Sequence, residues 1–139
     1  MKNIAVTVIV GFITGLVISG ILFDVIKYIG KSFNRVSVSW NISKAEKAYS
    51  NGRFSDSVLI YKKTLPKISL DNKILLAKTK NNLALSLYKN YLTTKKDEEL
   101  KEALILFKEA EKIYLELNNQ ELAEQTAQNI LVANNQPSL

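Results

Sequence analysis

The sequence predicts an all-α protein in which a single transmembrane helix precedes a helical domain. The 20 residues from Ile4 to Phe23 carry no charge, and at 1.5 Å per residue they match the roughly 30 Å hydrocarbon core of a bilayer. From Ile42 onward, apolar residues return at spacings of three and four, which is the helical period. Prolines occur only at Pro66 and Pro137, so few points interrupt a helix.

The amino-terminal part divides into three predicted segments. We expect a short extracytoplasmic amino terminus over residues 1–3, a transmembrane helix over residues 4–26 and a basic interfacial linker over residues 27–40. The alternatives are a cleaved signal peptide and a helix buried in an oligomer. A signal peptide needs a small-x-small cleavage site close behind its apolar run, and the nearest pair, Ser37 and Ser39, lies well beyond it.

Basic residues predict the orientation of the span. Lys27, Lys31 and Arg35 follow it, whereas Lys2 alone precedes it, and lysine and arginine favour the cytoplasmic side. We therefore expect an integral, single-pass membrane protein with a cytoplasmic carboxyl-terminal domain, or a stromal one in a thylakoid. The same three basic residues are candidates for contact with an anionic lipid surface.

Small residues recur every fourth position within the predicted span, and such stripes let two helix backbones approach closely. Self-association or pairing with a partner's helix is one interpretation, and ordinary transmembrane composition is the other. The stripe consists of Thr7, Gly11, Gly15 and Ser19.

Residues 41–133 form the predicted helical domain, and residues 134–139 a frayed tail. Ser43 with Glu46 makes a capping-box pattern at the first helix start, and Gly52 supplies its stop. Pro66 implies a kink or an early end of the second helix. The expected helices are Ser43–Asn51, Ser55–Ile68, Asn72–Leu92, Lys96–Leu117 and Gln120–Ala133.

The spacing of small and aromatic residues repeats along this domain. Ala45, Ala48-Tyr49, Gly52, Phe54, Ser57 and Tyr61 resemble a tetratricopeptide repeat, and a second copy runs through Asn82-Leu83-Ala84, Leu87-Tyr88, Ala103, Phe107 and Ala110. The second copy carries a seven-residue insertion between Ala84 and Ala103. The resemblance implies an antiparallel helix-pair solenoid of about two repeats plus a capping helix. A plain helical bundle is the alternative.

The resemblance also implies a concave groove that binds a peptide or protein. Lys78, Tyr88 and Lys89 could hold an acidic or amphipathic segment, while the alternative is solvated lysines and a core tyrosine. The family's carboxylate clamp is incomplete here, because only Asn82 matches it and Glu46 stands where the first helix needs asparagine. The predicted groove residues are Glu46, Tyr49, Lys78, Asn81, Leu85, Tyr88, Lys89, Gln125 and Gln128.

Composition narrows the chemistry. The sequence has no cysteine and no histidine, which removes thiol nucleophiles, disulfides, imidazole bases and Cys/His metal sites.

Residues 27–96 hold 15 basic and 3 acidic residues, whereas residues 97–139 hold 3 basic and 9 acidic ones. The basic half attracts phosphates as well as lipid, yet arginine is scarce and no nucleic-acid-binding motif appears. We expect neither an enzyme nor a cofactor.

Two functions follow. The first is a single-pass, membrane-anchored adaptor, scaffold or assembly factor that recruits a protein partner, a membrane complex, through the groove. The second is a permanent accessory subunit of a larger membrane complex, photosynthetic or translocating, held through its transmembrane helix.

Overall fold

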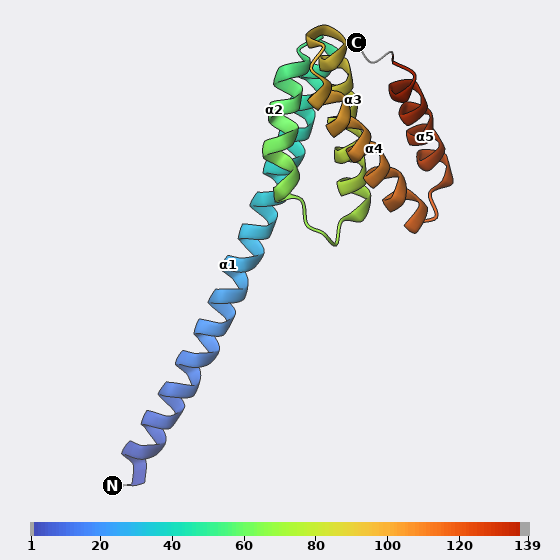
Figure 1. Ribbon diagram of the computed structural model, residues 1–139. Coiled ribbons are helices and arrows are strands. Elements are labelled where there is room, and N and C mark those ends of the chain that lie inside the picture. Colours follow the sequence, from blue (N-terminus) through green and yellow to red (C-terminus); the bar gives the residue numbers. More distant parts are fainter. Residues whose placement is uncertain (1, 137–139) are drawn as a thin grey trace. The chain divides into compact units, whose positions relative to one another are not determined.

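The computed structural model describes the backbone of residues 2–136 and the side chains of residues 22–32 and 34–136. Every regular element in this range is helical, which confirms the all-α class (Figure 1). The elements are α1 (Lys2–Ser50), α2 (Phe54–Thr64), the 3-10 helix η1 (Leu65–Lys67), α3 (Lys73–Thr94), α4 (Asp97–Glu116) and α5 (Gln120–Asn134).

The chain divides into two compact units, Met1–Ser37 and Val38–Leu139. Helix α1 runs through the boundary, so the predicted linker over residues 27–40 is helical. The predicted start at Ser43 is therefore wrong: Ser43 lies inside α1, because the residues before it continue the helix and leave no free backbone N–H groups for a cap.

The transmembrane prediction is also corrected. Among the helices that the structure describes, none is long and apolar enough to cross a membrane. From Leu22 onward, α1 carries Asp24, Lys27 and Lys31, so a charge returns every three or four residues. The expected integral, single-pass localisation is corrected with it.

Part of this prediction concerns residues that are not described. Most of the expected span over residues 4–26 falls among residues 1–21, whose side chains lie outside the described part of the chain. The same holds for the predicted packing stripe of Thr7, Gly11, Gly15 and Ser19.

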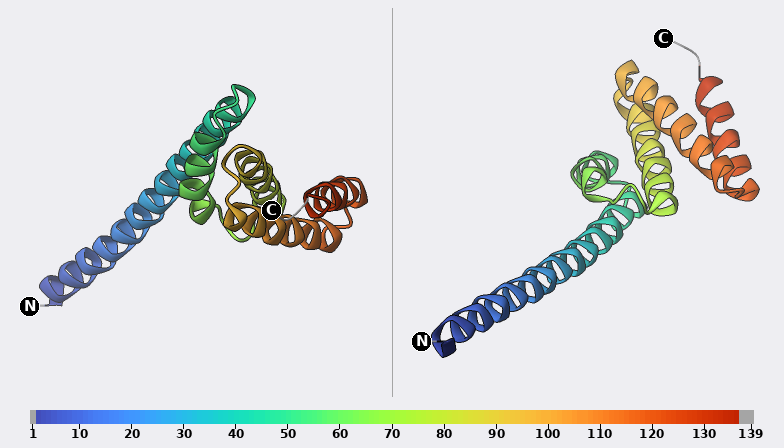
Figure 2. Two further views of the ribbon diagram at one scale, coloured as in Figure 1. Left: turned by 45° about the horizontal axis from the view of Figure 1, so that its top comes forward. Right: turned by 90° about the horizontal axis from the view of Figure 1, so that it is seen from below.

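The second unit is a stack of helices in which sequence neighbours pack together. Helix α2 packs on α3, α3 on α4 and α4 on α5, and α3 also touches α5 (Figures 1 and 2). Residues Ala45 and Ile42 of α1 join the same core, so all five α-helices contribute to it.

Small side chains lie where the helices cross. Ala45, Ser57, Ala84 and Ala103 are fully buried, and the Ser57 and Ser86 hydroxyls share a 2.9 Å hydrogen bond between α2 and α3. Large aromatic side chains fill the space beside them, chiefly Tyr61, Tyr91 and Phe107.

The residues between Ala84 and Ala103, where the repeat pattern predicts a seven-residue insertion, lie in helices α3 and α4 and the short turn between them. Helix α3 has 22 residues and α4 has 20, against 11 in α2, and only two residues separate α3 from α4. Asn90 anchors this region, since its side chain accepts a hydrogen bond from Ser55 at 2.8 Å and donates one to Glu99 at 2.8 Å.

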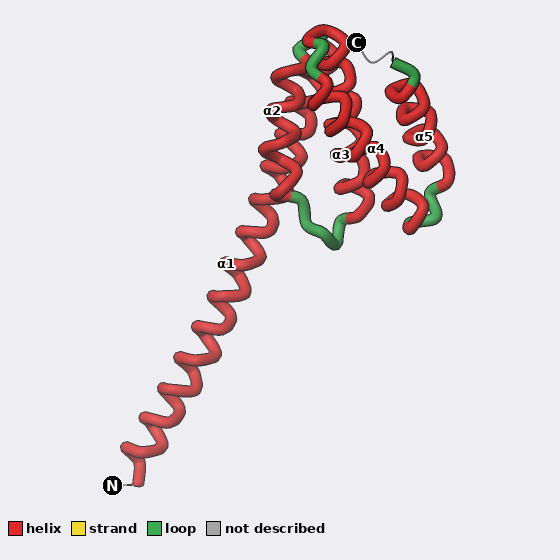
Figure 3. The backbone as a smooth tube through the Cα atoms, in the orientation of Figure 1, coloured by secondary structure: helices red, strands yellow, loops and turns green. Residues whose placement is uncertain are grey.

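The helix ends follow local backbone chemistry (Figure 3). At the end of α1, Gly52 has φ +73°, its N–H donates to the Tyr49 carbonyl, and the Arg53 N–H donates to the Ala48 carbonyl. This pair of bonds is the Schellman motif. Asn118, with φ 54°, repeats the motif at the end of α4.

Proline and asparagine set the other boundaries. Helix α2 ends at Thr64, and Pro66 lies in η1, as the expected early end requires. The side chain of Asn72 caps α3, and that of Asn119 caps α5.

Glutamates spaced seven residues apart on α4 join it to the preceding helices. Glu102 pairs with Lys62 at 2.6 Å, Glu109 with Lys80 at 2.7 Å and Glu116 with Lys73 at 3.3 Å. One stripe of the acidic helix therefore faces lysines of α2 and α3.

Gly52→Ala tests the Schellman stop of α1. A Cβ at Gly52 would meet nothing within 4 Å, so only the left-handed backbone is penalised, by about 1 kcal/mol. The free energy of unfolding in urea should fall by that amount. Gly30→Ala is the control, because Gly30 lies inside α1 and its added Cβ also meets nothing within 4 Å. Equal effects of the two substitutions would contradict the assignment.

Candidate binding pocket

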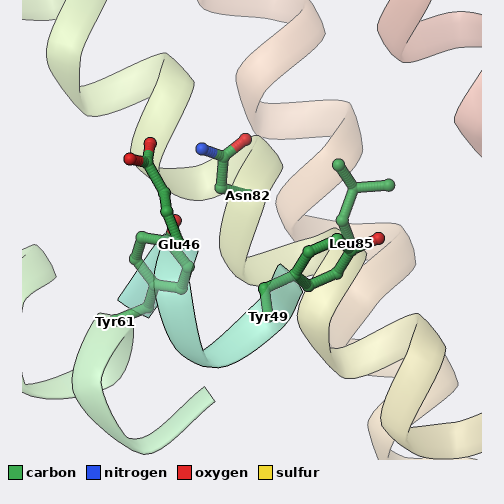
Figure 4. Close-up of a pocket in the computed structure, with 5 residues that line it drawn as sticks. All are labelled: Glu46, Tyr49, Tyr61, Asn82 and Leu85. Carbon is green, nitrogen blue, oxygen red and sulfur yellow. The ribbon is translucent and has the colours of Figure 1, made fainter. Parts of the chain in front are cut away.

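A small pocket opens between α1, α2 and α3 of the second unit. Its volume is about 120 Å³, and Figure 4 shows Glu46 and Tyr61 at one end and Tyr49 and Leu85 at the other, with Asn82 between them. Glu46 and Tyr49 come from α1, Tyr61 from α2, and Asn82 and Leu85 from α3. The pocket thus combines a carboxylate, an amide and two phenols with an aliphatic side chain.

The stop of α1 holds one wall of this pocket. Tyr49 is the last-turn residue whose carbonyl accepts the Gly52 N–H. Its ring packs edge-on against Phe54, the first residue of α2, with centroids 5.4 Å apart and planes at 66°. The turn after α1 therefore places Phe54 against the Tyr49 ring and holds the ring in position.

Tyr61 lies at the base and is only 1% exposed. Its pKa is raised from 10.0 to about 12: burial is the largest cause, a hydrogen bond with Asn82 lowers the pKa, and the nearby Glu46 carboxylate raises it. Burial also raises the pKa of Tyr49. Both phenols therefore stay protonated and uncharged at neutral pH.

Glu46 brings the only carboxylate among these lining residues. The ion pairs of the described side chains join Arg53 to Asp56 and three lysines to the α4 glutamates, and none includes Glu46. Its carboxylate is thus available to a ligand.

Three predicted groove residues, Glu46, Tyr49 and Leu85, line the pocket together. Lys78 and Lys89 lie on the same side of α3, four residues before Asn82 and four after Leu85. Lys78 is exposed and Lys89 is half-buried.

The remaining predicted groove residues lie elsewhere. Tyr88 is only 7% exposed and belongs to the core, which matches the alternative of a core tyrosine. Asn81 faces α5, where the Thr126 hydroxyl donates to its side-chain oxygen at 3.4 Å. Gln125 and Gln128 are exposed on α5 and do not line the pocket.

Asn82 and Tyr61 are the pocket residues that the groove prediction missed. The positions 78, 82, 85 and 89 follow the helical period, so taking Lys78, Leu85 and Lys89 together would have selected Asn82 over Asn81. Tyr61 gave no such signal, because it fills an aromatic core position of the repeat pattern.

Lys27, Lys31 and Arg35 belong to the first unit, and all three are exposed. Their role at an anionic lipid surface stays a prediction. No group of acidic residues among the described side chains could hold a metal ion.

A second, more polar hollow of about 330 Å³ lies beside the turn from α1 to α2, next to Asn90 and Thr93. Its polar side chains already bond one another: Ser55 to Asn90, and Arg53 to Asp56 at 3.6 Å. These contacts stabilise the turn. They also leave fewer polar side chains free to bind a ligand here than in the pocket between α1, α2 and α3.

Comparison with known proteins returned no matching family model, no matching curated protein and no matching solved structure. The tetratricopeptide resemblance therefore stays a prediction based on the repeat pattern.

Alkaline unfolding tests the environment of Tyr61. Between pH 10 and about 12 the folded protein keeps the Tyr61 proton that the unfolded chain has lost, so the free energy of unfolding falls as pH rises through this range. Tyr61→Phe removes the group, and its stability should fall less steeply there than that of the wild type. Urea unfolding at several pH values, with absorbance at 295 nm to follow phenolate, measures this. Parallel curves would contradict the assignment.

Proposed function

We propose that this chain is a protein-interaction module that binds a partner polypeptide at the pocket between α1, α2 and α3. The observation that carries the proposal is the convergence of Glu46, Asn82 and Leu85 on one opening from two different helices. A partly buried mixture of apolar surface and oriented polar groups is typical of a site that anchors a partner's side chain.

The size of the pocket favours a polypeptide over a small metabolite. Small-molecule sites commonly enclose about 300–1,000 Å³, whereas this pocket holds about 120 Å³. That space suits one side chain, with the rest of the partner lying across the surface of α1 and α3.

A second candidate function is a permanent subunit of a larger protein assembly. It is favoured by the first unit, where five large apolar side chains of α1 are 47–67% exposed. Contiguous exposed apolar surface of this kind marks an interaction site. The residues are Leu22, Phe23, Val25, Ile26 and Ile29.

Leu85→Ala tests the interaction module. Truncating an anchor contact should reduce recovery of the partner about tenfold, measured by quantitative mass spectrometry of proteins captured with the full-length chain. Leu104→Ala is the matched control, because Leu104 is also a half-buried leucine packed on the core but does not line the pocket. The proposal fails if both variants fold and no captured protein depends on Leu85.

Phe23→Asp combined with Ile26→Asp tests the subunit function. Charge on the apolar face of α1 should release the chain from its assembly, so that its native mass falls to that of the free chain in size-exclusion chromatography with light scattering. Leu59→Asp with Ile105→Asp is the control, since both are exposed apolar residues of the second unit. An unchanged mass with the first pair would rule this function out.

A further inference from the structure

We infer that the pocket receives a lysine side chain of the partner polypeptide, flanked by acidic residues; this inference rests on the proposed function and specifies its ligand. The pocket presents hydrogen-bond acceptors at one end and apolar surface at the other. A lysine side chain matches this, because its apolar methylene stem ends in an ammonium group that donates hydrogen bonds.

The charge of the pocket argues for a cation. Glu46 takes part in none of the ion pairs of the described side chains, whereas Glu102, Glu109 and Glu116 each have a lysine partner. A partner carboxylate would be repelled by Glu46, and a purely aliphatic side chain would cover that charge without compensating it. An ammonium group would compensate it.

The neighbours of Glu46 complete a set of acceptors. Lysine ammonium has three donors and no acceptor. The pocket offers the Glu46 carboxylate and the Asn82 side-chain oxygen, while the Tyr61 phenol is already hydrogen-bonded to Asn82. Asn82 is not saturated, because the contact that its oxygen receives from Asn81 is long, at 3.5 Å.

The opposite end suits the lysine stem. Leu85 and the Tyr49 ring, held by Phe54, provide apolar surface for the methylene groups. Arginine is the competing cation, because its planar guanidinium matches both oxygens of the Glu46 carboxylate, and an arginine peptide is therefore included in the test.

Two basic residues beside the pocket favour acidic residues on either side of the partner's lysine. Lys78 and Lys89 flank the pocket on α3, and neither takes part in an ion pair of the described side chains. Eleven positions of helix separate them, which is roughly 16 Å. An extended peptide covers that distance in about five residues. Acidic residues two positions before and two after the lysine would therefore lie near Lys78 and Lys89.

The probe follows from this geometry. We choose the peptide acetyl-Glu-Ala-Lys-Ala-Glu-amide, and as its match the same peptide with norleucine, which keeps the stem of lysine and removes the charge. Binding to the full-length chain is measured by titration of amide resonances, including the Asn82 side chain.

The expected result is a loss of affinity of about tenfold or more when norleucine replaces lysine in the peptide, because a charge-assisted hydrogen bond is removed. Glu46→Gln should cause a similar loss and should abolish the preference for lysine over norleucine. Glu98→Gln, the same charge change at an exposed position of α4, should leave both affinities unchanged.

Three results would overturn the inference. They are equal affinity of the two peptides, an unchanged preference in Glu46→Gln, and tighter binding of the corresponding arginine peptide. If the partner's recovery still depends on Leu85 in that case, the interaction module stands and only the lysine assignment fails. Independence from Leu85 as well would remove both.

Discussion

The close approach of helices through small side chains is the constraint on which the second unit depends. Ala45, Ser57, Ala84 and Ala103 are fully buried at successive helix crossings. Larger residues there would separate the helices, and the aromatic side chains beside them would no longer fill the gaps. The same spacing determines how far apart α1 and α3 lie, and hence the width of the pocket between Glu46 and Asn82.

The ion pairs between helices also depend on how the helices pack. The sequence separates charge along its length, basic before residue 97 and acidic after it, and we first related this asymmetry to lipid. In the folded chain, lysines of α2 and α3 meet glutamates of α4 at Lys62, Lys73 and Lys80. Exposed pairs of this kind contribute little individually. Their common spacing nevertheless favours one register of α4 against its neighbours, so part of the asymmetry belongs to packing.

Local chemistry made some features predictable and others not. Gly52, Pro66 and Asn118 determine backbone geometry within a few residues, and the helix ends near them were predicted from sequence. The amino-terminal limit of the first domain helix was missed, because a capping box at Ser43 is indistinguishable in sequence from two well-spaced polar residues inside a longer helix. Asn81 and Asn82 differ by one position, which rotates the side chain by 100° around the helix, and the spacing of Lys78, Leu85 and Lys89 places Asn82 on the side of the pocket.

The burial of Tyr61 affects how the pocket responds to changes in pH. Its phenol stays uncharged far above neutral pH, and the sequence contains neither histidine nor cysteine. No imidazole or thiol therefore changes the pocket in the ordinary range of acidity or redox state. Binding at the pocket would thus not be controlled through a histidine or a cysteine of this chain.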